Sequence, residues 1–170
     1  VKRHKYARAR EQIERLLALD AKNLDYRSLA ATAAIGLGAT EKAISIYQDM
    51  LADAPDAPDL HLWYAHALKT VGRVPEAIAA YRRAASKLPS LGEAYWSLAN
   101  LKTFRFTPED IAALRVQLAS KDIDDEDRFH LDFALGKALE DAGDYAASFE
   151  HYTKANALRR KSQPYPRDQT

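Results

Sequence analysis

The sequence repeats at an interval of 34 residues, and this period limits the fold more than any other feature of the chain. When the chain is aligned with itself at this offset, turn-forming and packing residues coincide: Gly38 with Gly72, Ala43 with Ala77, Tyr47 with Tyr81, and Pro55 with Pro89. A repeat of this length is one supersecondary unit, which stacks on its neighbours to bury a shared core. The period therefore predicts an array of similar units.

Each unit is expected to be a pair of helices. The chain holds 32 Ala among 170 residues, against 7 Pro and 6 Gly, and Ala is the strongest helix former. A first helix is predicted at Asp25–Leu37 and again at Asp59–Val71. In both cases a Gly turn follows, and a Pro ends the second helix. The predicted fold class is all-α, a right-handed superhelix of antiparallel helix pairs.

Small residues mark the places where helices are expected to approach closely. They lie midway along the predicted first helices (Ala31, Ala65, Ala99 and Gly136) and on the second helices (Ala43, Ala77 and Ser148). Tyr47, Tyr81 and Tyr152 follow the second group by four residues, which places them on the same helix face. We expect these aromatic rings to fill the gap between units.

Capping patterns predict where further helices begin. Ser90 and Glu93 have the spacing of a capping box. Thr107 precedes Pro108, and Asp124 opens an acidic run, so both are predicted to begin helices with negative charge in the first turn.

The repeats resemble the tetratricopeptide repeat. In the best copy the resemblance depends on Ala65, Gly72, Ala77, Tyr81, Ala84 and Pro89, and the copy departs from the pattern at His61, where an aromatic residue is usual. The resemblance implies a solenoid in which the first helix of each unit lines a concave wall.

We interpret residues 1–165 as one tetratricopeptide array, followed by a tail at 162–170. Residues 1–23 hold the second helix of a truncated repeat, and further repeats follow at 24–57, 58–91, 92–124 (degenerate) and 125–161 (with the end of the last helix). Gly72 and Gly143 are 71 residues apart, three more than two repeats, so three extra residues are assigned to the degenerate repeat. The chain begins at Val1 without an initiator Met, from which we expect a fragment or a processed chain.

A second resemblance covers residues 92–165. The segments 96–106, 125–131, 133–140 and 152–160 resemble the region that joins the repeats to the catalytic domain of bacterial tetratricopeptide-repeat sulfotransferases. This resemblance implies a parent protein whose C-terminal domain transfers a sulfuryl group from 3′-phosphoadenosine 5′-phosphosulfate. The chain has no match to the family's phosphosulfate-binding loop, so no catalytic residue is carried over to it.

Several function classes have no support in the sequence. There is no Cys, which excludes disulfides and thiol catalysis and is compatible with a reducing cytoplasm. The Gly36–Gly38 pair is expected to cap a helix and lacks the Lys and Ser/Thr of a phosphate loop. His61 and His66 are five residues apart and cannot share a metal, and Glu126 and His130 lack a third ligand. We therefore predict no catalytic residue, no metal and no cofactor for this chain.

Membrane and nucleic-acid partners are also not expected. No apolar run approaches the ~18 residues of a membrane span, and the formal net charge is +1. The basic ends, Lys2, Arg3, Lys5, Arg8 and Arg10 with Arg159, Arg160 and Lys161, lack the interleaved aromatic residues of a base-stacking surface. A nucleic-acid adaptor is thus the weakest alternative.

The expected binding surface is the concave wall, whose side chains recur at fixed offsets along the first helices. It is suited to an extended peptide held by side-chain bonds to its backbone, with Asn100 as the best amide and Trp96 as an anchor; packing of Trp96 and Phe133 within the superhelix is an equal alternative. The candidate residues are Ser28, Thr32, Ile35, Leu62, His66, Lys69, Trp96, Asn100, Thr103, Phe133, Lys137 and Glu140.

The sequence favours two functions for this protein. The first is a scaffold that binds a protein or peptide segment, either in a larger protein with a C-terminal sulfotransferase domain in cis or as a stand-alone adaptor in a bacterial complex. The second is the substrate-presenting arm of such an enzyme. Truncation at Val1 also leads us to expect end-to-end self-association, since a capping unit is missing.

Overall fold

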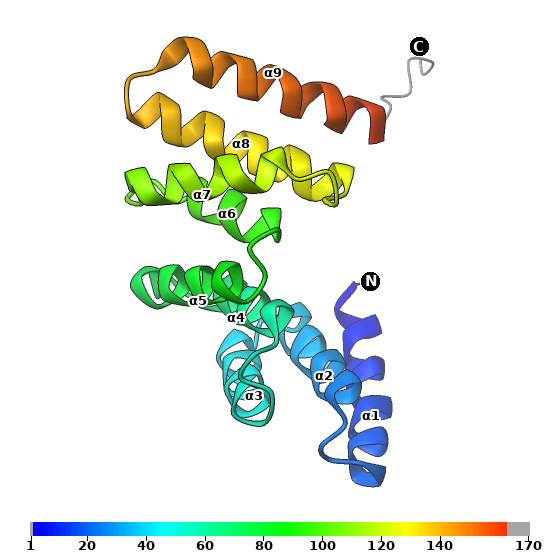
Figure 1. Cartoon of the computed structure of the whole chain (residues 1–170). Coiled ribbons are helices and arrows are strands. Elements are labelled where there is room, and N and C mark those ends of the chain that lie inside the picture. Colours follow the sequence, from blue (N-terminus) through cyan, green and yellow to red (C-terminus); the bar gives the residue numbers. More distant parts are fainter. Residues whose placement is uncertain (1, 163–170) are drawn as a thin grey trace, which may run out of the picture. The chain divides into compact units, whose positions relative to one another are not determined.

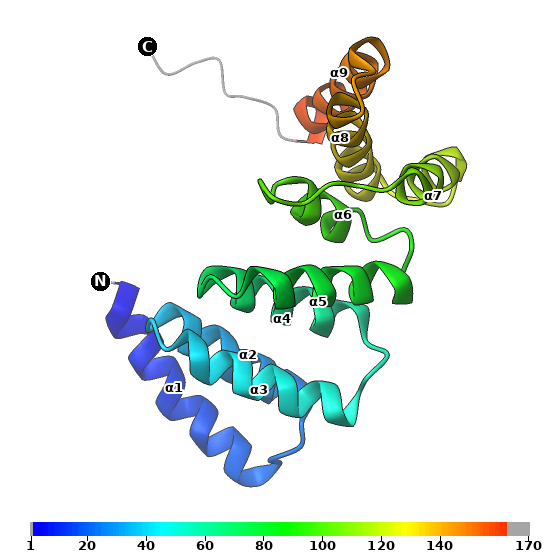
Figure 2. The same cartoon turned by 90° about the vertical axis from the view of Figure 1, so that its left-hand side faces the viewer.

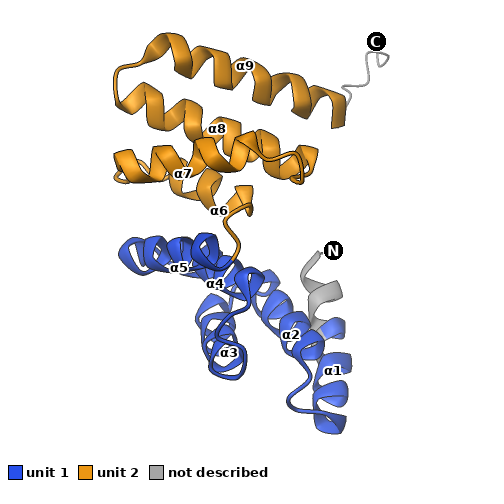
Figure 3. Ribbon diagram, in the orientation of Figure 1, with its two compact units in different colours: residues 1–87 blue, residues 88–170 orange. Residues whose placement is uncertain are grey.

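The computed structural model describes the backbone of residues 2–162 and the side chains of residues 8, 9 and 11–162. These residues form nine α-helices and no strand, which confirms the all-α prediction. The chain divides into two compact units, Val1–Lys87 and Leu88–Thr170, coloured separately in Figure 3. The tail predicted at 162–170 lies outside the described residues apart from Ser162, the last residue of the final helix.

Unit 1 contains five helices in which each packs against the next along the chain (Figures 1 and 2). The helices are α1 (Lys2–Leu19), α2 (Leu24–Gly36), α3 (Thr40–Asp53), α4 (Pro58–Thr70) and α5 (Val74–Lys87). The bounds of α2 and α4 lie within one residue of the first helices predicted from the repeat.

Unit 2 is built around its longest helix pair. It contains α6 (Gly92–Ala99), α7 (Pro108–Ala119), α8 (Asp125–Asp141) and α9 (Tyr145–Ser162). Helices α8 and α9 form an antiparallel hairpin, and α6 and α7 both pack against α8 (Figure 1). Helix α6 has only eight residues and is followed by a non-helical segment, residues 100–107.

The same glycine turn joins the two helices of three hairpins. Gly38, Gly72 and Gly143 have φ values of 82°, 82° and 83°, a left-handed conformation that glycine adopts without steric cost. In each turn the residue after the glycine donates its N–H to a carbonyl five residues earlier, for example Arg73 to Leu68 at 3.0 Å. This pattern is the Schellman motif. Gly143 therefore has the same structural role as Gly72, although it lies three residues beyond two repeat lengths.

The small residues that the repeat places between helices are buried in both units. Ala31, Ala43, Ala65 and Ala77 are all 0% exposed in unit 1. In unit 2, Ser148 donates a buried hydrogen bond of 2.7 Å to the carbonyl oxygen of Gly136, which joins α8 to α9. Because these positions carry almost no side-chain volume, the helix axes can approach closely.

Ala99 does not follow this pattern. The repeat predicts a close helix contact there, but α6 ends at Ala99 and the residue is only half-buried. No second helix turns back onto α6, because residues 100–107 lack the Gly turn and α7 packs against α8 instead. The space beside Ala99 is open as a result.

Two of the predicted helix openings are confirmed. Thr107 and Asp110 form a reciprocal capping box at the start of α7, and Asp124 accepts from the N–H of Asp127 at the start of α8. The box predicted at Ser90 and Glu93 is wrong.

Helix α6 begins one residue later than that box requires. Its N-cap is Leu91, which makes no side-chain cap, and the N–H of Gly92 donates instead to Oδ1 of Asp127 on α8 at 2.8 Å. A tertiary hydrogen bond thus replaces the local one.

Candidate protein-binding site

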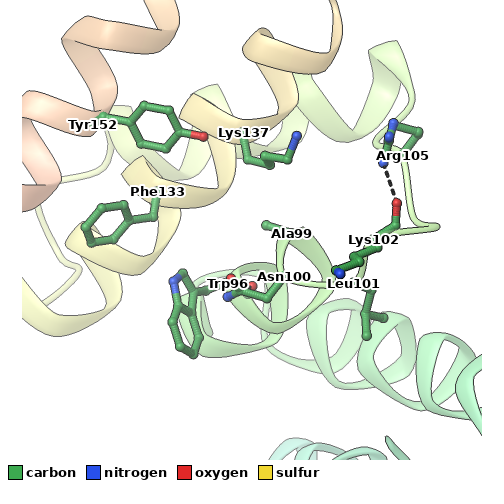
Figure 4. A pocket seen from close by; sticks show the side chains of 9 residues that line it. All are labelled: Trp96, Ala99, Asn100, Leu101, Lys102, Arg105, Phe133, Lys137 and Tyr152. Atoms are coloured by element: carbon green, nitrogen blue, oxygen red, sulfur yellow. Dashed lines mark hydrogen bonds between the residues drawn. The ribbon is translucent and has the colours of Figure 1, made fainter. Parts of the chain in front are cut away.

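A pocket of about 410 Å³ opens in unit 2 beside Ala99, where the third repeat departs from the hairpin plan. We name it the Trp96 pocket (Figure 4). Helix α6 and the segment after it form one side, and α8 and α9 form the other. Its lining residues are Trp96, Ala99, Asn100, Leu101, Lys102, Arg105, Phe133, Lys137 and Tyr152.

Aromatic rings from three helices line the Trp96 pocket. Trp96 comes from α6, Phe133 from α8 and Tyr152 from α9. The ring centroids of Phe133 and Tyr152 are 6.3 Å apart, and the Trp96 ring lies 5.3 Å from the His130 ring behind it. Such surfaces bury large apolar area with little loss of side-chain entropy, which makes them effective anchors for a partner side chain.

Three cations line the same pocket. Nζ of Lys137 lies 2.5 Å from Oδ1 of Asp141, and Nε of Arg105 lies 3.6 Å from the other oxygen of that carboxylate. Arg105 also donates to the carbonyl oxygen of Lys102 at 3.0 Å, the bond drawn in Figure 4. The ammonium group of Lys102 has no partner among the described residues. Two carboxylates, those of Asp141 and Glu140, therefore face three cations, and the pocket retains a positive bias.

Polar groups at the edge of the pocket have unused bonding capacity. Nδ2 of Asn100 donates to the carbonyl oxygen of Trp96 at 2.8 Å, which leaves its second N–H and Oδ1 for other partners. The hydroxyl of Tyr152 donates to Oε2 of Glu140 at 2.8 Å. Burial and this bond to a carboxylate both raise the pKa of Tyr152, so the phenol stays neutral and acts as a donor.

The structure brings four of the predicted site residues of unit 2 into this pocket: Trp96, Asn100, Phe133 and Lys137. Glu140 lies next to it through its bonds to Tyr152 and Lys137. Thr103 is exposed in the segment after α6 and does not line the pocket.

The predicted residues of unit 1 have different environments. Leu62 is 3% exposed and is a core residue. Nδ1 of His66 is bonded to the hydroxyl of Tyr81 at 2.8 Å, and Oγ1 of Thr32 donates to the carbonyl oxygen of Ser28 at 3.0 Å. The side chain of Lys69 is exposed at the end of α4, and Ile35 is 39% exposed on α2.

Sequence reasoning missed two groups of polar residues. Lys102 and Arg105 follow a helix whose early end the repeat does not predict, although the missing Gly turn after Ala99 was a signal. Asp132 and His151 form a part-buried hydrogen-bonded pair, with Oδ1 and Nδ1 2.7 Å apart. They are 19 residues apart on different helices, and no local pattern links them.

The described residues do not form a metal site or a membrane-spanning helix. No group of three or more His, Asp or Glu side chains is positioned for a metal ion within the described part of the chain. None of the described helices is both long and apolar enough for a membrane span. Of the basic N-terminal cluster, the side chains of Lys2, Arg3, Lys5 and Arg10 lie outside the described residues.

Comparison with known proteins agrees with the helix-pair architecture. The models of two tetratricopeptide-repeat families match the sequence, one over residues 1–58 and the other over residues 34–101. No curated protein sequence matches the chain. The repeats thus define a class of scaffold that has neither catalytic activity nor a cofactor of its own.

Solved structures share the fold over nearly the whole chain. A crystal structure of MamA superposes with a TM-score of 0.67 at 18% identity, covering 96% of this chain and 95% of MamA. The tetratricopeptide-like repeats of a kinesin light chain from Podospora anserina superpose with a TM-score of 0.62 at 19% identity, covering 95% and 90%. The chain is a tetratricopeptide-repeat protein. The likeness of residues 92–165 to sulfotransferase-associated repeats has no support in these matches and stays a prediction.

Proposed function

We propose that this protein is a scaffold that holds an extended segment of a partner protein, and that the Trp96 pocket is the anchor point of that segment. One observation carries the proposal: Trp96, Asn100, Phe133 and Lys137, chosen from the sequence as wall residues of two repeats, line one pocket. The pocket lies where the regular hairpin plan is interrupted, so it is a feature of this chain and not of every repeat.

The chemistry of the pocket favours a particular kind of segment. The rings of Trp96, Phe133 and Tyr152 suit an apolar or aromatic side chain. Lys102 and Arg105 suit a neighbouring carboxylate, because they outnumber the acidic groups that reach them. The free N–H and Oδ1 of Asn100 suit the peptide backbone. The favoured ligand is an extended peptide with an apolar anchor next to an acidic residue.

The test is a selection from a random peptide library displayed against the full chain, followed by affinity measurement on the selected peptides. We expect enrichment of apolar residues next to Asp or Glu, and loss of binding in Trp96→Ala by tenfold or more, about 1.4 kcal/mol. Trp63→Ala in α4 is the matched control, and thermal unfolding checks the fold of both variants. Equal affinity of Trp96→Ala and the wild-type chain would exclude this pocket as the anchor.

We also propose that the remaining polar wall residues of unit 1 extend the binding surface. Ser28, Thr32, His66 and Lys69 keep polar groups near the surface of α2 and α4, whereas Leu62 is left out because its side chain is buried. Alanine variants of Thr32 and Lys69 should each weaken peptide binding only a few-fold, as is usual outside a hot spot.

A second candidate function is the repeat arm of a sulfotransferase that presents the acceptor substrate. It rests on the resemblance of residues 92–165 and on the interruption after Ala99 that the same segment contains. 3′-Phosphoadenosine 5′-phosphosulfate would then be a cofactor of a C-terminal domain in cis and not of this chain. The sequence encoded downstream in the parent gene decides the matter: a phosphosulfate-binding loop supports the proposal, and a downstream region without one contradicts it.

Self-association through the N-terminal repeat is a further part of the proposal. Leu19 at the end of α1 is 83% exposed, and Leu24 and Leu29 on α2 are 43% and 50% exposed. Sedimentation velocity of the full chain and of Leu19→Ser tests this expectation, since a dimer that uses this edge should dissociate more readily in the variant. We also propose a cytoplasmic location, with which the absence of Cys is compatible.

A further inference from the structure

A second pocket, with apolar and charged lining residues, lies on another face of α8, among α7, α8 and α9. We name it the His151 pocket. It has a volume of about 420 Å³ and shares no lining residue with the Trp96 pocket. Its lining residues are Leu118, Arg128, Asp132, His151, Lys154, Ala157 and Leu158.

A part-buried hydrogen bond orients the imidazole at the wall of this pocket. Asp132 is 5% exposed, and its Oδ1 lies 2.7 Å from Nδ1 of His151. Because a carboxylate only accepts hydrogen bonds, Nδ1 carries the proton. The other ring nitrogen, Nε2, has no hydrogen-bond partner among the described residues. It is not buried, so a ligand can reach it. Asp132 thus fixes the ring so that Nε2 is left for a ligand.

The pocket also contains two cations without carboxylate partners. Arg128 donates to the carbonyl oxygens of Leu118 at 3.0 Å and Ser120 at 2.7 Å, which are neutral acceptors at the end of α7. Lys154 lies one turn after His151 and is exposed, with no partner among the described residues. The charged groups that line the pocket are therefore Arg128 and Asp132 from α8 and Lys154 from α9, while α7 contributes Leu118 only.

We propose that the His151 pocket binds the carboxylate of an acidic side chain from a protein segment, with apolar neighbours of that side chain against Leu118 and Leu158. The carboxylate bonds to the ammonium group of Lys154 and to Nε2–H of the His151 imidazolium. His151 takes up one proton from solvent when the ligand binds, since a neutral ring with Nδ1–H offers only an acceptor at Nε2. Asp132 stabilises the resulting imidazolium, and Arg128 adds positive potential while it holds the end of α7.

The proposal does not depend on the Trp96 pocket. Arg128 and Asp132 are four residues apart on one face of α8, and Phe133 and Lys137 are four residues apart on another. A partner segment can therefore occupy either pocket alone, and the two sites can be separated by mutation.

The probe is a blocked peptide of sequence Leu-Glu-Glu-Leu, titrated into the full chain while the ring resonances of His151 are followed by NMR. The Trp96→Ala background removes the other pocket from the measurement. We expect the resonances of the His151 ring to shift toward those of the doubly protonated ring as the acidic peptide is added. The neutral peptide Leu-Gln-Gln-Leu should leave the ring unchanged.

A lysine variant and its control complete the experiment. Lys154→Gln should weaken binding of the acidic peptide roughly fivefold. Lys161→Gln, two turns further along the same face of α9, removes the same charge outside the pocket and should not weaken it. Equal affinity for the glutamine peptide, or an equal effect of both lysine variants, would overturn the proposal. Equal affinity of the library-selected peptide for Trp96→Ala and the wild-type chain, together with the expected His151 response to the acidic peptide, would contradict only the proposed function above.

Discussion

The ring of Tyr152 occupies the space that a side chain at Gly136 would need. A Cβ placed on Gly136 would stand 2.9 Å from Cδ1 and Cε1 of Tyr152, closer than carbon atoms approach without a clash. Tyr152 also lines the Trp96 pocket, so this contact links the packing of α8 on α9 to the shape of the candidate site.

Gly136→Ala should therefore lower stability although alanine favours a helix. Overpacking costs about 1–3 kcal/mol, and the gain in helix propensity offsets up to about 1 kcal/mol of that. Urea unfolding measures the difference. In the double variant Gly136→Ala/Tyr152→Ala the second change should cost less than it does alone, because the clash has gone. Additive effects would contradict the contact.

The turn glycines should respond differently from the packing glycines. Gly72 has a left-handed φ of 82°, but a Cβ there would meet nothing within 4 Å. Gly72→Ala should cost about 1 kcal/mol, and Gly72→Asn should cost less, since asparagine tolerates this conformation. The same order is expected at Gly38 and Gly143, and an equal cost of Ala and Asn at all three positions would contradict the backbone explanation.

Gly92 presents the opposite case. A Cβ there would lie 2.3 Å from the backbone oxygen of Asp127, which cannot move aside without displacing α8. Gly92→Ala should cost about 2 kcal/mol or more by overpacking, and Asn should be no better than Ala. Ser90→Ala is the control, and we expect it to be neutral because Ser90 does not cap α6.

The repeat period predicts local turns well, but it does not predict helix bounds that depend on tertiary contacts. Gly38 and Gly72 could be placed because a turn glycine is determined by its own backbone conformation, which a few residues of sequence reveal. The start of α6 could not be placed, since the N–H of Gly92 donates to Asp127, 35 residues further along the chain. The positions of Lys102 and Arg105 follow from the other end of α6, where the helix stops at Ala99 without a Gly turn.

The candidate site likewise has a part that the repeat predicts and a part that depends on tertiary packing. Trp96 and Asn100 at α6 correspond to Phe133 and Lys137 on α8 once the three extra residues of the degenerate repeat are added to the 34-residue offset, and all four line one pocket. Leu62 occupies the corresponding place in unit 1, but there its side chain is buried in the core. Side-chain burial depends on the helices packed around each position, and a period alone does not describe them.

His130 should make stability depend on pH. Burial lowers the pKa of His130 below its ordinary value of 6.5, and its buried Nδ1 has no hydrogen-bond partner among the described residues. The folded state therefore binds fewer protons at this site than the unfolded state. The stability it contributes is present above about pH 6.5 and is lost as the pH falls through the lowered pKa.

His130→Phe removes this dependence and keeps a ring between Trp96 and Phe129. The free energy of unfolding, measured in urea at pH 7.5 and at pH 5.5, should fall less in the variant than in the wild-type chain. Acidic groups titrate in both proteins and cancel in the comparison. An identical fall in the two proteins would show that His130 is not desolvated.

The central claim is that the Trp96 pocket anchors a partner segment, and the two tryptophan side chains of the chain offer the most direct measurement. The indole N–H resonances of Trp96 and Trp63 are followed in ¹⁵N-labelled protein while a peptide selected from the library is added. We predict a saturable shift of the Trp96 signal and an unchanged Trp63 signal. Saturable binding that leaves Trp96 unchanged would contradict the account.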